Sequence, residues 1–266
     1  MLQDLFSLKG RVALITGGSR GIGKMIARGF IAQGARVYIS ARKAAACEAT
    51  AEALSAEGGT CIPLPADVST VEGIKALAAA YGKHEPKLDI LVNNAGAAWG
   101  APFDEFPENG WDKVLDLNLK APFFLTQALA PALRAAATPE RPAKVINISS
   151  IDGIHLTHNE TYSYVSSKAG LHQLTRLMAS TLVRDHVYVS ALAPGAFQSD
   201  MNRDARDRAD EVAKRIPAQR IGNADDMAGA AIFLASRAGD YVIGSTLVVD
   251  GGVAYAQRAG RVLPED

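Results

Sequence analysis

The sequence predicts an α/β fold: one domain built on a doubly wound, parallel sheet with helices on both faces. Short apolar segments alternate with helical patterns along the whole chain, as they do in such folds. These segments, 145–148 among them, show little period-two alternation, which suits strands that are buried on both faces of a parallel sheet. The predicted strands lie near residues 11–16, 36–40, 60–65, 88–92, 143–149, 187–193 and 246–250.

Composition favours a single domain over residues 1–266 that binds neither nucleic acid nor a membrane. The chain has 266 residues, 48% of them apolar, and no linker, repeat or charge block divides it. Its 28 basic and 28 acidic residues balance, which argues against a strongly basic surface. The apolar stretch 121–137 is broken by polar residues and Pro131, and the N-terminus does not read as a signal peptide. We therefore expect a cytoplasmic protein in which Cys47 and Cys61 stay reduced.

The first predicted strand, 11–16, runs directly into a glycine-rich loop, 17–23, and then into a helical pattern. Glycines let a backbone approach a phosphate closely, and the helix N-terminus supplies N–H groups and a favourable dipole. Met25 stands where a P-loop hydrolase has the hydroxyl that holds Mg²⁺, and Ile26 where the standard dinucleotide motif has its third glycine. Neither of these two motifs therefore fits the loop, and the motif that it does contain is formed by Thr16, Gly17, Gly21 and Gly23.

A second signal is the helical turn from Tyr164 to Lys168. Four-residue spacing places a phenol and an ammonium on the same face of a helix. An ammonium favours the phenolate, so we expect the phenol pKa to fall below its usual value of about 10. Taken alone, such a pair is more often two surface residues that meet by chance. Together with the glycine-rich loop, it predicts acid–base chemistry.

With both motifs, the sequence resembles the short-chain dehydrogenase/reductase family over nearly its whole length. Residues 93–96 match the family's N-N-A-G element at the end of the fourth strand, and 250–252 match its C-terminal Asp-Gly-Gly signature. The turn at 194–195 matches the Pro-Gly that lies on the nicotinamide side. The resemblance implies a Rossmann-type sheet of about seven strands, with a dinucleotide at their carboxyl ends.

The cofactor implied by this resemblance is NADP(H). An NAD-specific site would place a carboxylate after the second strand, whereas this chain has Arg42 there, and Arg20 is placed to help bind a 2′-phosphate. The alternative is that both arginines are simply solvated. Asp67 is expected to accept from the adenine amine, and Ser199 to meet the nicotinamide carboxamide. The residues expected at the cofactor are Gly17, Ser19, Arg20, Gly21, Ile22, Gly23, Arg42, Asp67, Val68, Asn94, Ala95, Gly96, Tyr164, Lys168, Pro194, Gly195 and Ser199.

The resemblance also implies four catalytic residues. Tyr164 is expected to give its proton to a carbonyl oxygen as hydride arrives, and Ser150 to hydrogen-bond the same oxygen. Lys168 is expected to lower the phenol pKa and bind the nicotinamide ribose. Asn118 is expected to hold a water that links Lys168 to solvent.

Two nearby residues of the same types are excluded by geometry. Tyr162 lies six residues before Lys168, about 240° round a helix, so it cannot share that face. Strand alternation points Ser149 away from Ser150. We therefore expect neither to take part in the reaction.

The substrate pocket is expected to form from loops that follow the strands, at 97–100 and 151–161, together with a lid at 196–216. The expected lining residues are Trp99, Ile151, His155, Phe197 and Met201. A metal site at His155 and His158 is a poor alternative because no nearby carboxylate or third ligand completes it. We therefore expect no metal.

Within the family, segments 93–100, 142–148 and 171–174 are similar to the β-ketoacyl reductases of bacterial rhamnolipid synthesis. That likeness implies NADPH-dependent reduction of a ketone to a secondary alcohol, with a 3-oxoacyl thioester as the substrate. The alternative is a dehydrogenase or reductase of a small ketone, sugar or polyol, which the same residues would serve. A third hypothesis is a nucleotide-sensing protein that has lost the chemistry; the intact catalytic residues argue against it.

The helical patterns at about 109–136 and 162–184 resemble those that family members pack against symmetry mates. They carry more apolar residues than one side of a sheet needs, which predicts a dimer or tetramer. The alternative is that all of these residues face the sheet. They are Ala128, Leu129, Ala132, Leu133, Leu171, Leu174, Leu177 and Met178.

Overall fold

The predicted strands all form, and they lie in one parallel sheet in the computed structural model, which describes residues 4–156 and 159–256. All six residues of the fifth strand are buried, Lys144 and Asn147 included, as its lack of period-two alternation predicts. The strand order across the seven-stranded sheet is β3-β2-β1-β4-β5-β6-β7. The strands are β1 Val12–Thr16, β2 Arg36–Ser40, β3 Thr60–Pro63, β4 Ile90–Asn93, β5 Ala143–Ile148, β6 Val187–Pro194 and β7 Thr246–Val249.

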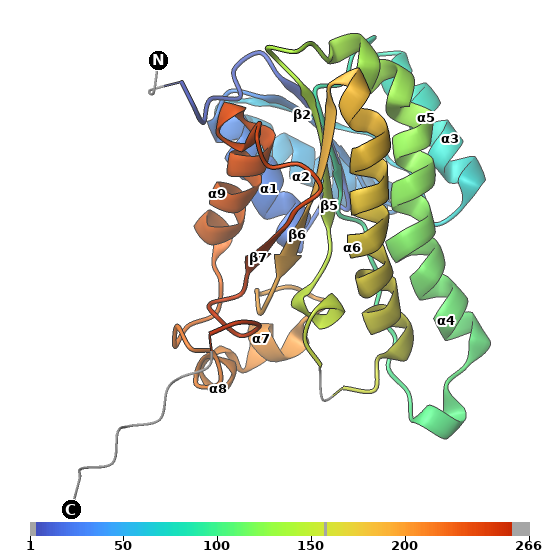
Figure 1. Cartoon of the computed structure of the whole chain (residues 1–266), viewed down its shortest axis with the longest axis vertical. Coiled ribbons are helices and arrows are strands. Elements are labelled where there is room, and N and C mark those ends of the chain that lie inside the picture. Colours follow the sequence, from blue (N-terminus) through green and yellow to red (C-terminus); the bar gives the residue numbers. More distant parts are fainter. Residues whose placement is uncertain (1–3, 157–158, 257–266) are drawn as a thin grey trace, which may run out of the picture.

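Helices cover both faces of this sheet (Figure 1). Successive strand residues point to opposite faces, so Ile15 packs against α1, α2 and α9, whereas Leu14 packs against α3, α5 and α6. The result is the predicted doubly wound, Rossmann-type architecture. The longer helices are α1 Gly21–Ala32, α2 Ala44–Ala56, α3 Val71–Gly82, α4 Glu108–Leu115, α5 Ala121–Ala136, α6 Tyr162–Leu182 and α9 Ala224–Ala235.

Short helices occupy several connections. The two short helices α7 Arg203–Asp207 and α8 Ala209–Ala213 lie in the predicted lid, beyond the carboxyl end of the sheet (Figure 1). A π-helical turn, Asp116–Lys120, joins α4 to α5, so the long pattern predicted at 109–136 is a helix with a wide turn inside it. The 3₁₀ turns are η1 Phe103–Glu105, η3 Ile151–Gly153, η4 Val183–Asp185 and η5 Arg237–Gly239.

The order of strands reverses at β1, which pairs with β2 on one side and β4 on the other. In open parallel sheets, ligands bind at this point, outside the carboxyl ends of the strands. Asn93 at the end of β4 donates to its register partner Asn147 on β5 (2.9 Å) and to Thr126 on α5, and Asn147 donates to Thr175 on α6 (2.9 Å). This buried ladder fixes α6 against the sheet.

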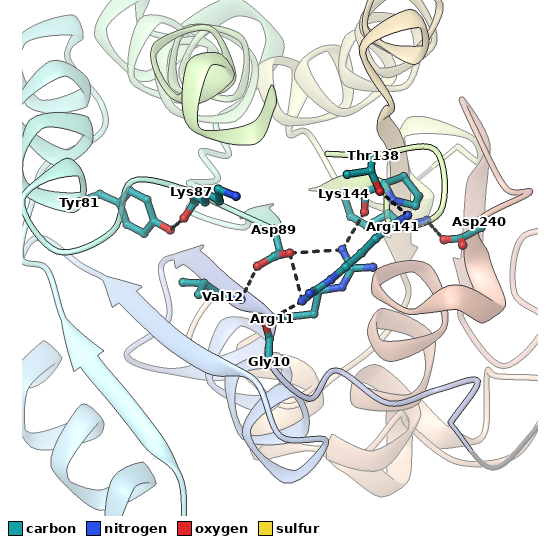
Figure 2. A network of polar contacts seen from close by, with 11 residues as sticks. Gly10, Arg11, Val12, Tyr81, Lys87, Asp89, Thr138, Arg141, Lys144 and Asp240 are labelled. Atoms are coloured by element: carbon teal, nitrogen blue, oxygen red, sulfur yellow. Dashed lines mark hydrogen bonds and ion pairs between the residues drawn. The ribbon is translucent and has the colours of Figure 1, made fainter. Parts of the chain in front are cut away.

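A cluster of charges closes the opposite, amino end of the sheet (Figure 2). The carboxylate of Asp89 accepts from the Val12 N–H (2.9 Å), lies 3.5 Å from the Arg11 guanidinium, and lies 3.4 Å from that of Arg141. Nearby, the buried Lys144 ammonium pairs with Asp240 at 2.7 Å. These groups join β1, β4 and β5 far from the carboxyl ends, so we assign them a structural role.

No helix in the described part of the chain is both long and apolar enough to cross a membrane.

Candidate active site

The glycine-rich loop is held by the strands on either side of it. The Thr16 hydroxyl accepts from the backbone N–H groups of Asn94 and Ala95, both at 3.0 Å. The Asn94 amide donates to the carbonyl oxygens of Thr16 (2.8 Å) and Gly17 (3.2 Å). The end of β1 and the end of β4 are thereby joined directly across the point where the strand order reverses. These bonds place Asn94 and Ala95 beside the glycine-rich loop.

Two glycines of the loop are needed because other groups approach them closely. A Cβ on Gly23 would lie 2.4 Å from the Gly17 carbonyl oxygen, and one on Gly17 would lie 2.8 Å from the Asn94 amide nitrogen. Gly17 and Gly21 also have positive φ, at 64° and 52°. Helix α1 begins at Gly21 with no side-chain cap on its N-terminus. Such a loop before an uncapped helix suits the pyrophosphate of a dinucleotide.

The remaining residues predicted around the adenosine surround this loop. The Ser19 carbonyl accepts from Thr50 (2.9 Å), which ties the loop to α2. Arg42 is exposed just after β2, and the described residues give it no ion-pair partner. Asp67 is exposed and accepts from the Ser69 N–H (3.0 Å), while Val68 is buried. An arginine, and no carboxylate, lies just after β2 in the structure, as the sequence predicts for a site that binds NADP.

Arg20 lies in the glycine-rich loop, and its guanidinium forms an ion pair with Asp200 in the predicted lid. Its predicted role at the 2′-phosphate stays a prediction. On the same segment, the Ser199 hydroxyl accepts from the Asn202 N–H (3.1 Å). The Gly195 N–H donates to the Val249 carbonyl (3.0 Å), and a Cβ there would lie 2.7 Å from that of Asp250. The Pro-Gly turn therefore fixes the start of the lid against the C-terminal strand.

Three of the predicted catalytic residues lie close together: Ser150 follows the carboxyl end of β5, and Tyr164 and Lys168 lie in the first two turns of α6. A side-chain hydrogen bond joins Ser150 to the Tyr164 phenol. Lys168 is buried, its ammonium donates to the Ile148 carbonyl (2.8 Å), and it lies 5.6 Å from the centre of the Tyr164 ring. The turn η3, which follows Ser150, packs on α6 so tightly that a Cβ on Gly153 would lie 2.7 Å from the Lys168 carbonyl carbon. Phenol, hydroxyl and ammonium thus form one cluster.

The prediction that the phenol pKa falls was wrong. Burial raises the pKa of Tyr164 to about 12, against the lowering effect of the Ser150 hydrogen bond, and the Asp152 carboxylate raises it further. Burial also lowers the pKa of Lys168 to about 8. Residue spacing shows that the two side chains share a face, but not that both leave water. The phenol therefore stays protonated near neutral pH, which is the form that can give a proton to a carbonyl.

Asn118 lies on the π-helical turn and is buried. Its side-chain oxygen accepts from the Ala97 N–H (2.8 Å), and its amide nitrogen donates to the Ala97 carbonyl (2.8 Å) and to Ser167 (3.1 Å). The residue therefore ties the loop after β4 to α6, next to Lys168. Single π turns often occur at functional sites because they re-aim one side chain. Its predicted water-holding role stays a prediction.

The two excluded residues make other contacts. The Tyr162 hydroxyl donates to Glu160 (2.9 Å), and its ring packs edge-on against Phe103 and Phe106. The Ser149 hydroxyl donates to the Lys168 backbone carbonyl (3.1 Å). Both hydroxyls therefore bond outside the cluster of Ser150, Tyr164 and Lys168.

The predicted pocket residues divide into two groups. The Met201 methyl group lies 3.7 Å from where a Cβ of Gly96 would be, so the lid reaches the loop beside Asn118. Trp99 is half-buried against α4, and Ile151 and His155 flank the turn after Ser150, half-buried and exposed respectively. The prediction for Phe197 was wrong: it is only 2% exposed, because its ring packs into the core against Gly222, where no side chain stands in the way.

No group of three potential metal ligands occurs among the described residues. His158, considered as a ligand from the sequence, lies outside the described residues. Cys47 and Cys61 are both buried and free, and burial raises the pKa of both thiols.

A family model described as "Enoyl-(Acyl carrier protein) reductase" matches residues 17–254, from the glycine-rich loop to the C-terminal turn. The chain belongs to the short-chain dehydrogenase/reductase family. The rhamnolipids biosynthesis 3-oxoacyl-[acyl-carrier-protein] reductase of Pseudomonas aeruginosa is 49% identical over 256 residues, which cover 94% of this chain and 99% of that protein.

Two solved structures of short-chain dehydrogenase/reductases show the same fold. The Pseudomonas aeruginosa RhlG/NADP active-site complex is 47% identical, with a TM-score of 0.90, and the match covers 94% of this chain and 98% of that one. A gluconate 5-dehydrogenase from Burkholderia cenocepacia J2315, in complex with NADP and tartrate, is 36% identical, with a TM-score of 0.87 over 95% of this chain and 98% of that one.

Three residues of this short-chain dehydrogenase/reductase site were missed from the sequence. Thr16 was read only as part of the glycine motif, although a hydroxyl at the end of a buried strand signals a polar partner. Asp152, two residues after Ser150, was an equally visible carboxylate beside the serine predicted to be catalytic. Asp200 carried no comparable signal, because nothing in the sequence shows that it meets Arg20.

Proposed function

We propose that this protein is an NADPH-dependent reductase that converts the ketone of a 3-oxoacyl thioester to a secondary alcohol. The observation that carries the proposal is the 49% identity to the 3-oxoacyl reductase of Pseudomonas aeruginosa along nearly the whole of both chains. The cluster of Ser150, Tyr164 and Lys168 supports it, because those groups can bind and protonate a carbonyl oxygen.

The residues at the cofactor end fit a phosphorylated dinucleotide. The glycine-rich loop runs into the N-terminus of α1, which has no side-chain cap, so its backbone N–H groups suit a pyrophosphate. Arg42 would bind the 2′-phosphate, where NAD-specific relatives need a carboxylate. Bound NADPH would supply the hydride.

In this proposal the chain's own residues handle the carbonyl oxygen. Ser150 and Tyr164 hydrogen-bond it, and Tyr164 transfers its proton as negative charge develops there. The ammonium of Lys168 then stabilises the phenolate that remains. With its pKa raised to about 12, the phenol is protonated near neutral pH and can supply the proton that reduction needs.

The environment of the phenol favours a neutral substrate over a sugar acid. Asp152 lies on η3, its N–H donates to the Ser150 hydroxyl (3.1 Å), and its negative charge acts on the Tyr164 phenol. The carboxylate of a keto acid would be repelled by the same charge, whereas a thioester is uncharged at its carbonyl groups. Reduction of a keto sugar acid is the second candidate because a gluconate 5-dehydrogenase is 36% identical to this chain, but the charge of Asp152 disfavours it.

Comparing two substrates tests the proposal. NADPH consumption should be measured with a 3-oxoacyl thioester carried on pantetheine and with 5-keto-D-gluconate, and the alcohol products identified by mass spectrometry. We expect kcat/KM to favour the thioester by at least about tenfold. Faster reduction of ketogluconate would support the second candidate. NADPH binding without reduction of either ketone would support a nucleotide sensor.

We also propose a homo-oligomer that forms through α4, α5 and α6. An apolar groove of about 430 Å³ runs between these helices, lined by Leu115, Leu119, Phe123, Gly170 and Leu174 together with Asp116 and Lys120. Leu177 on α6 is 63% exposed beside it. A second copy that buried this groove and Leu177 would stabilise the helix that carries Tyr164.

The residues predicted for this interface divide between two faces. Ala128 and Leu177 are exposed and Ala132 and Leu174 are half-buried, so these four are available to a partner. Leu129, Leu133, Leu171 and Met178 are buried under the helices, where the sheet and neighbouring helices already cover them. A charge at Leu133 would therefore disrupt the core of the subunit and does not test association.

We propose a cytoplasmic location, as the sequence led us to expect. The free state of Cys47 and Cys61 supports a reducing compartment. The use of NADPH as a reductant supports the same location. Fractionation of the source cells with an antibody to the protein tests it.

A further inference from the structure

Arg20 and Asp200 form an ion pair between the glycine-rich loop and the predicted lid, although they lie at opposite ends of the chain. The side chain of Arg20 is 73% exposed and that of Asp200 is 50% exposed. Each side chain therefore remains open to water and to any ligand that enters between the loop and the lid. Among the described residues, Asp200 is the one hydrogen-bond and ion-pair partner of the Arg20 guanidinium.

Neighbours of Asp200 show where the lid lies. The Ser199 Cβ is 3.3 Å from where a Cβ of Gly21 would be, so the lid touches the first turn of α1. Met201 reaches the loop after β4 at Gly96, beside Asn118. Residues 199–201 therefore lie across the mouth of the nucleotide site, and Asp200 draws the Arg20 side chain toward them.

Asp200 has a second cation. The Arg206 guanidinium on α7 lies 3.1 Å from its other carboxylate oxygen. The hydrogen bonds from Arg20 and Arg206 together hold the pKa of Asp200 below its usual value. If Arg20 leaves, the exposed Asp200 carboxylate keeps its hydrogen bond from Arg206, which also pairs with Asp207 (2.7 Å). Arg20 can thus be exchanged between partners at little cost.

We propose that Asp200 competes with the 2′-phosphate of NADPH for Arg20 and so sets how tightly this protein holds its phosphorylated cofactor. The inference rests on the proposed use of NADPH. A guanidinium satisfies a phosphate as well as it satisfies a carboxylate, and it cannot satisfy both in full when they lie on different sides of it. NADH has no 2′-phosphate, so its affinity does not depend on this exchange.

The size of the effect follows from the exposure of the pair. Ion pairs between exposed side chains are weak, and screening by salt weakens them further. Freeing Arg20 from Asp200 should therefore tighten NADPH binding by about two- to fivefold, and by less at high ionic strength.

Equilibrium binding of NADPH and NADH to Asp200→Asn, followed by cofactor fluorescence, tests the inference. We expect the Kd of NADPH to fall by about two- to fivefold and that of NADH to stay unchanged. Asp204→Asn is the matched control, because Asp204 is an exposed carboxylate in the same segment that pairs with Arg208 and not with Arg20. It should change neither Kd.

A double-mutant cycle separates competition for Arg20 from the mere loss of a negative charge. With Arg20→Gln in place, Asp200→Asn should no longer tighten NADPH binding. The inference is overturned if the gain persists in the Arg20→Gln background, if NADPH and NADH change equally, or if Asp200→Asn weakens NADPH or leaves its Kd unchanged. A failure of the proposed cofactor is separate: the unmodified protein would then show no preference for NADPH over NADH.

Discussion

Replacing Lys168 by methionine should make the protein more stable while abolishing turnover. Methionine has a similar length and no charge, and Lys168 is only 5% exposed. Burial lowers the pKa of Lys168 from 10.5 to about 8, which corresponds to about 3 kcal/mol at neutral pH. Loss of the hydrogen bond to the Ile148 carbonyl offsets about 1 kcal/mol of this. Lys168→Met should therefore raise the free energy of unfolding by about 2 kcal/mol at neutral pH.

The gain should depend on pH in one direction. In the folded protein Lys168 loses its proton near pH 8, whereas in the unfolded chain it keeps it up to about 10.5. Between those values the unfolded chain binds more protons, so the stability of the unmodified protein rises with pH by about 1.4 kcal/mol per pH unit from this group. The advantage of Lys168→Met should be fully present below about pH 8 and nearly gone at about pH 9.5.

Urea unfolding of the cofactor-free protein at these two pH values measures the effect, because the difference between variant and parent cancels the titration of all other groups. Lys120→Met is the control, since that ammonium is exposed and pairs with Asp116 on the surface. A stability difference for Lys168→Met that is the same at both pH values would refute the reasoning, and so would a less stable variant at neutral pH.

Three further changes test other parts of the structure. Arg42→Asp should weaken NADPH binding at least about tenfold and shift preference toward NADH, because it repels the 2′-phosphate and offers the ribose a partner; unchanged Kd values would remove Arg42 from the site. Leu177→Glu should dissociate the oligomer and lower activity, as seen by light scattering alongside turnover; a parent protein that is monomeric and fully active would exclude the proposed assembly. Asp89→Asn should lower the free energy of unfolding by about 3 kcal/mol, while Asp185→Asn, at a more exposed pair, should change it by less than about 1 kcal/mol; equal effects would contradict a buried role for the cluster at Asp89.

The fold could be predicted from the sequence because its strands are short, apolar and buried on both faces. The segment predicted at 143–149 contains β5, in which every residue is buried. A short segment without period-two alternation is typical of a parallel strand that is buried on both faces. The closeness of Tyr164 and Lys168 could be predicted because their spacing is local: the two residues share one face of one helix. Features that depend on residues close together in the sequence could therefore be predicted from it.

Predictions failed where burial decided the outcome. The pKa of Tyr164 rises because the phenol leaves water, and a four-residue spacing says nothing about solvent. Phe197 and Leu133 were expected at surfaces, but the sequence cannot show that Gly222 leaves room for the Phe197 ring or that the sheet covers Leu133. The Arg20–Asp200 pair joins distant parts of the chain, so only the folded structure reveals it.

The central claim is that Tyr164 donates the proton in an NADPH-dependent carbonyl reduction. Single-turnover reduction of a 3-oxoacyl thioester by pre-bound NADPH should be compared for Tyr164→Phe and Tyr162→Phe, with the Kd of NADPH measured for both. We expect Tyr164→Phe to lose about 10²–10⁴-fold in rate with a nearly unchanged Kd, and Tyr162→Phe, whose hydroxyl bonds Glu160, to keep most of the rate. A Tyr164→Phe variant that stays active, or a Tyr162→Phe variant that is inactive, would contradict the account.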